Sequence, residues 1–245
     1  MTALRITSAS KRYGSAIALD NVSLEFPDNA ITAVIGASGC GKSSLLKLCN
    51  GLIRPDSGEV QLFGEAINYN ALPALRRRLG YAVQGNGLFP HLTARQNITL
   101  LARLEGRSEP QLNARCEQLM TLSQLRPEHL DRYPHQLSGG QQQRVGLCRA
   151  MMLQPEVLLL DEPFAAIDPI TREDIQHQLL ALHQAEPSTT VLVTHDMREA
   201  VLLAEHIVVM QAGRILHRLS SADLLSQHPG QDPQAILRQL LIEAP

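Results

Sequence analysis

The chain has 245 residues and a net charge of −2 at pH 7, a length that suits one large α/β domain with an inserted subdomain. This near-neutral balance gives no reason to expect nucleic acid as a partner or a polybasic membrane anchor. The first residues lack the apolar core of a signal peptide, and no apolar run approaches the roughly 20 residues that span a bilayer. The four cysteines are scattered, so we expect reduced thiols and neither a disulfide framework nor a zinc site.

The first thirty residues predict an antiparallel sheet. Residues 22–26 alternate apolar and polar side chains, as a half-buried strand does. Upstream, Tyr13 is one of only four tyrosines, and its ring offers a face on which adenine can stack. Ordinary packing of a tyrosine on a short strand explains Tyr13 equally well, so the residues alone leave both interpretations open.

Residues 36–43 read GASGCGKS and fit the phosphate-loop pattern G-x-x-x-x-G-K-[ST] in full. The loop follows a β-branched run, 31–35, that predicts a buried strand, and it precedes a helix-forming run. Glycines let backbone N–H groups approach phosphate oxygens closely, and the helix adds the positive end of its dipole. Lys42 supplies a charge for the β- and γ-phosphates, and the Ser43 hydroxyl is a magnesium ligand. An ordinary glycine-rich turn is the alternative, which this context disfavours.

The middle of the chain changes from strand to helix. Residues 79–83 predict a buried strand that ends at Gln84, and the Gly, Asn and Pro of 85–91 predict a flexible hinge. From Thr93 to about Arg132, apolar residues recur at helical spacing without β-rich runs, which predicts an inserted helical subdomain.

Residues 137–141, Leu-Ser-Gly-Gly-Gln, come before a further helical run. Small residues at a helix start predict a second N-terminus that can bind an anion. Because the segment has no lysine, it is not a second independent phosphate loop.

An apolar run at 157–160 ends at Asp161 and Glu162. This pattern places the acids at the carboxyl edge of a sheet, where open α/β sheets bind their ligands. Asp161 can hold Mg²⁺ there, and Glu162 can orient or deprotonate a water that attacks the γ-phosphate. Two solvated acids at a strand end are the alternative.

The last third predicts a helix from Asp168-Pro169, a buried strand at 190–194 and a hairpin over 207–216. His195 follows that strand and is therefore aimed at the same sheet edge as Asp161. Residues 221–245 predict short helices with a polar, proline-containing break.

In this order, the motifs resemble those of the nucleotide-binding subunits of ABC transporters, from about Lys11 to Leu216. The specific element is the signature 137–141, since a phosphate loop alone fits many NTPases. The resemblance implies an α/β fold: a P-loop NTPase (RecA-like) core sheet with an N-terminal antiparallel β subdomain and an inserted α-helical subdomain. It implies an ABC ATPase domain over 1–220, with the catalytic core and β subdomain in 1–90 and 150–220, the helical subdomain with the signature in 91–149, and a short helical C-terminal tail over 221–245.

The resemblance also implies roles for individual residues. Ser43, Gln84 and Asp161 surround Mg²⁺. Glu162 is the general base, and His195, Gln84 and Lys42 complete the catalytic set. The nucleotide-binding residues that it implies are Tyr13, Gly36, Ser38, Gly39, Cys40, Gly41, Lys42, Ser43, Ser44, Gln84, Ser138, Gly139, Gly140, Gln141, Asp161, Glu162, Asp168 and His195. Ser44 departs from the family pattern, in which threonine is more usual.

The resemblance explains how the signature can serve a phosphate site although it has no lysine. By resemblance, Ser138, Gly139 and Gly140 bind the γ-phosphate of ATP held by a second copy, so that two chains enclose two ATP molecules head to tail. Asp168 lies in the loop that crosses this interface.

The implied cofactors are ATP and Mg²⁺, and the implied partners are a second cassette, transmembrane permease subunits that dock near Gln84–His91, and a periplasmic or surface substrate-binding protein. No nucleic acid is expected. The implied location is peripheral, on the cytoplasmic side of the inner (plasma) membrane. Residues 77–84 and 87–93 are similar to importers of glycine betaine, choline and related quaternary amines. We therefore expect an ATPase that powers import of a quaternary amine, osmoprotectant or similar small polar solute. The alternatives are an exporter or lipid-transport cassette and a soluble, non-transport ABC ATPase.

Overall fold

The structure is a computed structural model that describes residues 2–85, 87–165, 167–227 and 231–242. It divides into two compact units, one formed by Met1–Arg76 with Ser188–Pro245 and the other by Arg77–Pro187. The second unit contains the whole segment 91–149 predicted as the helical subdomain, together with the strands and helix that flank it. In the described part of the chain, no helix is both long and apolar enough to cross a membrane.

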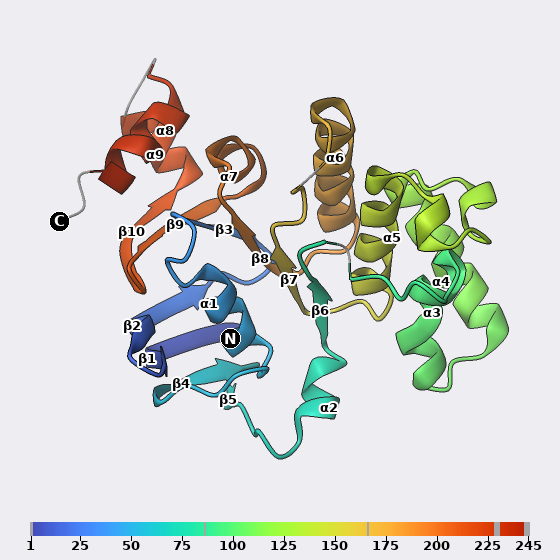
Figure 1. The fold of residues 1–245 in the computed structure, drawn as a ribbon, viewed down its shortest axis with the longest axis horizontal. Coiled ribbons are helices and arrows are strands. Elements are labelled where there is room, and N and C mark those ends of the chain that lie inside the picture. The colour runs from blue at the N-terminus through green and yellow to red at the C-terminus, as the bar shows by residue number, and fades with distance from the viewer. Residues whose placement is uncertain (1, 86, 166, 228–230, 243–245) are drawn as a thin grey trace. The chain divides into compact units, whose positions relative to one another are not determined.

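The first unit begins with an antiparallel sheet in the order β2-β1-β4-β5 (Figure 1). Its strands are β1 (Leu4–Tyr13), β2 (Ala16–Phe26), β4 (Ser57–Leu62) and β5 (Glu65–Ala66). The hairpin between β1 and β2 turns at Gly14, whose φ of 59° is the left-handed conformation that glycine adopts without strain. The antiparallel sheet predicted for the first thirty residues is therefore confirmed.

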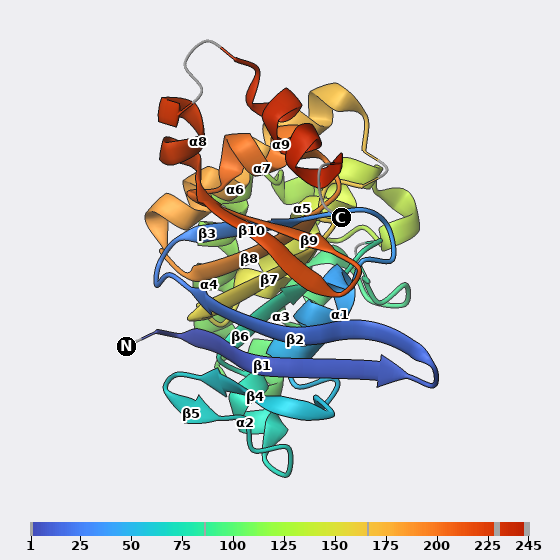
Figure 2. The same cartoon turned by 90° about the vertical axis from the view of Figure 1, so that its left-hand side faces the viewer.

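Four further strands of the first unit lie in the order β10-β9-β3-β8, side by side in Figure 2. They are β3 (Ile31–Ile35), β8 (Thr189–Thr194), β9 (His206–Gln211) and β10 (Arg214–Ser220). β3 pairs in parallel with both β8 and β9, and all residues of β3 and β8 are buried. Continuous apolar runs are typical of parallel strands covered on both faces, which explains why 31–35 and 190–194 were recognisable as strands. The helices of this unit are α1 (Lys42–Cys49), α2 (Leu72–Arg76), α7 (Met197–Leu203), α8 (Ser221–Gln227) and α9 (Pro233–Ile242).

The second unit combines a parallel strand pair with helices. β6 (Leu79–Ala82) pairs with β7 (Val157–Asp161). The helices are α3 (Ala94–Leu104), α4 (Glu109–Ser123), α5 (Gly139–Met151) and α6 (Pro169–Ala185), with the short 3-10 turns η1 (Pro127–His129) and η2 (Pro134–Gln136). The α4 side chains Leu112, Cys116 and Leu119 are buried as their helical spacing predicts.

A buried ion pair joins α4 to the end of α6 within this unit. Arg115 Nη2 donates to Glu186 Oε2 at 2.7 Å and to the Met151 carbonyl at 2.6 Å, and Nη1 donates to the other Glu186 oxygen. The two side chains are only 9% and 15% exposed. The guanidinium therefore satisfies a carboxylate and a helix-end carbonyl at once.

We expect Arg115→Ala to lower the free energy of unfolding by about 3–5 kcal/mol, because it removes the cation from a nearly buried carboxylate to which the uncharged Gln118 amide still donates at 3.1 Å. The measurement is the denaturant midpoint of the purified chain. The matched control is Arg103→Ala, whose pair with Glu109 is half-exposed and is worth less than about 1 kcal/mol. Equal losses in the two variants would contradict this assignment.

A candidate nucleotide site

The phosphate loop leaves β3 and can be built only with glycine at three of its positions. Gly39 and Gly41 have φ of 78° and 111°, in the region that favours glycine. A Cβ on Gly36 would lie 2.2 Å from the Met210 carbonyl oxygen, and one on Gly41 would lie 2.3 Å from that of Ala18. The loop is thus packed from behind by two backbone segments, which fixes its shape.

Lys42 opens α1 and lies beneath this loop. Its side chain is buried, and Nζ donates to the carbonyls of Gly36 at 2.8 Å and Ala37 at 3.0 Å. Ser38 and Ser43, in contrast, are exposed. The loop therefore presents open polar groups around one desolvated cation, which is the arrangement that a phosphate chain requires.

Cys40 contributes its backbone to the loop. Its N–H donates to the Ala37 carbonyl at 3.2 Å, and its own carbonyl accepts from Gly213 N–H at 2.9 Å. The thiol is buried, and the next hydroxyl after Ser43, that of Ser44, is half-buried. The turn between β9 and β10, which holds Gly213, thus supports the loop directly.

His195 leaves the sheet beside the phosphate loop. Ile35 of β3 and Thr194 of β8 are partners in the parallel register, so Gly36 and His195 follow them at the same carboxyl edge. The His195 side chain is exposed. The structure therefore brings the predicted γ-phosphate contact to the edge that carries the phosphate loop.

The bend that carries His195 is held by Glu199, a residue that no sequence pattern indicates. Thr194 Oγ1 donates to the Glu199 carboxylate and accepts from Asp196 N–H at 3.0 Å. Glu199 is only 4% exposed. A glutamate in the first turn of a helix is ordinary in sequence, and only its burial identifies it as a support for His195.

Tyr13 ends β1 with half of its surface exposed. Lys11 Nζ lies 5.9 Å from the centre of the ring and donates to Asp56 Oδ1 at 2.7 Å. Asp56 Oδ2 also accepts from Arg12 N–H at 2.7 Å, and these bonds lower the pKa of the Asp56 carboxyl. The strand end is fixed, and half of the tyrosine is open to solvent, so adenine stacking by Tyr13 stays a prediction.

In the second unit, the strand pair brings Gln84 and Glu162 together. Ala82 is the register partner of Leu160, and Gln84 Nε2 donates to Glu162 Oε2 at 3.1 Å. Glu162 has φ of 46°, which a residue with a side chain seldom adopts. Such strain is typical of functional sites, where the surrounding structure maintains it.

Asp161 ends β7 and is 6% exposed. The pKa of the Tyr81 hydroxyl is raised to about 12, first by burial and then by the negative charge of Asp161. Asp161 is therefore a desolvated carboxylate at the carboxyl end of its strand, next to Glu162.

The signature begins α5 with a complete capping box. Ser138 Oγ accepts from Gln141 N–H at 3.3 Å, and Gln141 Oε1 accepts from Ser138 N–H at 3.0 Å. A Cβ on Gly139 would have no atom of the described residues within 4 Å, whereas one on Gly140 would lie 2.2 Å from Thr171 Cγ2. Gly139 therefore leaves the start of the helix open to solvent, and the absence of a side chain at Gly140 lets Thr171 pack closely against the helix.

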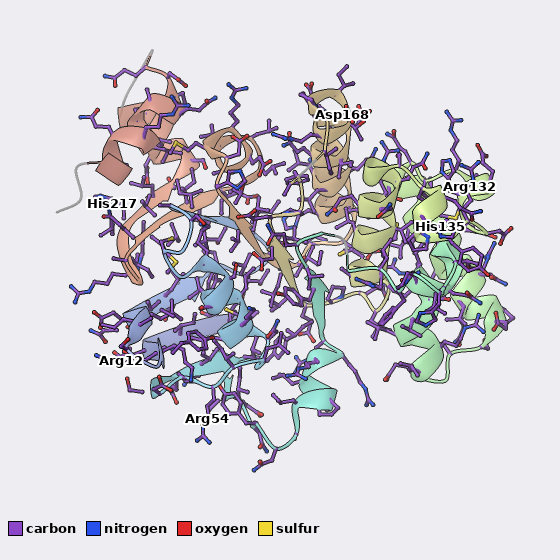
Figure 3. The ribbon with its side chains drawn as sticks, viewed as in Figure 1. Arg12, Arg54, Arg132, His135, Asp168 and His217 are labelled. Atoms are coloured by element: carbon purple, nitrogen blue, oxygen red, sulfur yellow. The ribbon has the colours of Figure 1, made fainter. Side chains whose placement is uncertain are left out.

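Asp168 caps α6 at the end marked in Figure 3. Its carboxylate accepts from Thr171 N–H at 3.0 Å, and hydrogen bonds from Thr171 lower the pKa of Asp168. Because Thr171 also contacts Gly140, the Asp168 loop and the signature are parts of one surface of the second unit.

The predicted site residues divide between the units. The first unit holds Tyr13, the loop 36–43, Ser44 and His195, and the second holds Gln84, Asp161, Glu162, the signature 138–141 and Asp168. Of the predicted permease-docking segment 84–91, residue 86 lies outside the described residues, and Phe89 is 43% exposed.

A family model described as ABC transporter matches residues 19–165. The chain belongs to the ABC transporter family. It is 43% identical over 94% of its length to the glycine betaine uptake system ATP-binding protein YehX of Escherichia coli K12, of which it spans 74%. It is 44% identical over 91% of its length to the choline transport ATP-binding protein OpuBA of Bacillus subtilis, of which it spans 58%.

Solved structures agree with this assignment. The ATP-binding cassette MJ0796, in a dimeric post-hydrolysis state bound to ADP and Pi, has a TM-score of 0.81 and 30% identity, covering 89% of this chain and 98% of that one. CbiO1 of Clostridium perfringens has a TM-score of 0.85 over 100% of this chain and 96% of that one, and its 24% identity supports the fold alone. The α/β P-loop NTPase fold and the ABC-type ATPase predicted from the motifs are confirmed.

Proposed function

We propose that Lys42 and the amides of the loop 36–43 hold the phosphates of ATP in this cassette, that Tyr13 stacks on its adenine, and that Glu162 is the general base. The observation that carries the catalytic assignment is the 3.1 Å hydrogen bond from Gln84 to Glu162. This bond fixes the Glu162 carboxylate at the carboxyl end of the strand pair, where a carboxylate can accept a proton from an attacking water. His195, at the edge that carries the loop, contacts the γ-phosphate.

Mg²⁺ suits the donor atoms of three residues. Ser43 offers a hydroxyl, and Asp161, which is 6% exposed, offers a carboxylate. Gln84 offers its amide oxygen, while its Nε2 donates to Glu162. Oxygen donors of these kinds are the ligands that Mg²⁺ prefers. When bound, Mg²⁺ neutralises charge on the phosphate oxygens.

The signature is proposed to complete the ATP site of a second copy. Ser138 and Gly139 are exposed, and they sit at a helix N-terminus whose amides favour an anion. A motif without lysine that is open to solvent suits a phosphate delivered by another chain. The dimeric state of the related cassette MJ0796 supports this arrangement.

Gly139→Ala tests the shared site. Among the residues that the structure describes, a methyl group there has no neighbouring atom within 4 Å, so we expect an unchanged denaturant midpoint. We also expect about a tenfold or greater weakening of the ATP-dependent dimer, since the methyl would occupy the surface that approaches the partner's phosphate. Light scattering of the variant in a hydrolysis-deficient background measures this. An undiminished dimer would show that Gly139 faces no nucleotide.

We further propose that the cassette lies on the cytoplasmic side of the inner membrane and powers an importer for a quaternary amine or similar osmoprotectant. The relatives named for glycine betaine and choline support this. The exposed Phe89, within the predicted docking segment, is proposed to meet a permease subunit. Copurification with permease subunits, and stimulation of ATP hydrolysis by glycine betaine with a substrate-binding protein, would support import. Association with exporter subunits would favour the alternative.

A further inference from the structure

His129 lies against the start of the signature helix. It ends η1, and only 8% of its surface is exposed. Its Nε2 is 3.2 Å from Nε2 of Gln141, the residue whose side chain completes the cap at Ser138. Within the part of the chain that the structure describes, the other ring nitrogen, Nδ1, has no hydrogen-bond partner. The contact with Gln141 is therefore what orients the imidazole.

The chemistry of these contacts fixes which atom donates. A backbone N–H can only donate, so the Gln141 atom 3.0 Å from Ser138 N is the acceptor Oε1. The amide Nε2, which can only donate, is then the atom that faces His129. It follows that His129 Nε2 accepts, and that the ring is neutral with its proton on Nδ1.

We propose that His129 is a positioning residue for the signature: its Nε2 lone pair orients the Gln141 amide, which in turn holds Ser138 and the first turn of α5 ready for the partner's nucleotide. This inference rests on the proposed shared site. It assigns to His129 no contact with ATP. Its effect passes through the side chain of Gln141, and it lasts only while His129 remains neutral.

The surroundings of His129 favour the neutral ring. Burial lowers the pKa of His129, as do the positive charges of Arg132 and Arg126 in its own segment and of Arg144 on α5, and only Glu128 raises it. The acceptor is therefore intact at neutral pH. As the pH falls through the lowered pKa, protonation places a second donor opposite the amide donor and breaks the contact.

The first test examines the unmodified protein. With ¹⁵N-labelled histidine at neutral pH, we expect the His129 resonances to show Nδ1 protonated and Nε2 unprotonated. This measurement requires neither a variant nor ATP turnover. A protonated Nε2 at neutral pH would overturn the proposal.

The second test measures the ATP-dependent dimer between about pH 8 and pH 5.5 in a Glu162→Gln background. We expect dimer association to weaken roughly tenfold on acidification, and His129→Gln, whose amide oxygen accepts without titrating, to reduce that change to about twofold. His135→Gln is the matched control, because His135 lies near the signature, stacked on Tyr133 at 5.9 Å, and Figure 3 labels it there. This control should titrate like the background.

The outcomes distinguish a failure of the His129 positioning role from a failure of the proposed shared site. An ATP-dependent dimer whose pH dependence is the same with His129 and with His129→Gln overturns the positioning role and leaves the shared site standing. A protein that stays monomeric with ATP at every pH overturns both. If His129→Gln does not fold, the protonation state of the ring in the unmodified protein decides.

Discussion

Replacing Glu162 by glutamine is expected to lower steady-state ATP hydrolysis by about 10²–10⁴-fold, the usual contribution of a general base. The substituted side chain has nearly the same shape and still offers an oxygen to Gln84 Nε2, so ATP binding should persist. Phosphate release measures the first effect. Titration with a fluorescent nucleotide measures the second.

Glu117→Gln is the matched control for Glu162. Glu117 is an exposed acid on α4 of the same unit, so removing its charge tests whether any nearby carboxylate supports turnover. We expect hydrolysis within about twofold of the parent, as for most surface substitutions. Intact hydrolysis in Glu162→Gln, or equal losses in both variants, would refute the assignment of the base.

Replacing Lys42 by alanine should weaken ATP binding by about 100-fold or more, which corresponds to about 2.7 kcal/mol. Lys42 is 6% exposed, so the attraction of its ammonium to phosphate is little screened by water. Hydrogen bonds to charged groups contribute about 1.5–3 kcal/mol each. Isothermal titration with ATP measures the loss.

Lys47→Ala controls for the loss of a positive charge. Lys47 lies on the same helix and is exposed, so the net charge changes equally while the phosphate loop is untouched. ATP affinity should change by less than about twofold, because salt screens exposed charges. A comparable loss in Lys47→Ala would mean that general electrostatic attraction, and not the Lys42 contact, accounts for binding.

Local signals predicted the parts of the fold that depend on neighbours in sequence. The β-branched run before the phosphate loop, the helix start at the signature and the helix start at Asp168-Pro169 are each indicated by residues close together in sequence. The same holds for Asp161 at a strand end. These features needed no knowledge of distant contacts.

What sequence could not supply are contacts between distant segments. Arg115 meets a glutamate 71 residues away, and no local pattern pairs one charge among many with another. The positive φ of Glu162 could not be predicted, because the residue at that position is not a glycine. Thr194 and Glu199 are five residues apart, yet only burial distinguishes that acid from one in water.

The first unit is built from two segments that are far apart in sequence. It can therefore fold completely only after the second segment has been synthesised. β3 lies between β8 and β9, and the phosphate loop is backed by the carbonyl of Met210 and the N–H of Gly213. While the phosphate loop has left the ribosome but the segment with Met210 and Gly213 has not, the loop lacks the contacts that fix its shape. The unit Arg77–Pro187 is continuous, so all of its own contacts can form while the rest is still being made. The nascent protein thus folds the unit that holds Glu162, the proposed base, before it completes the proposed site for the phosphate.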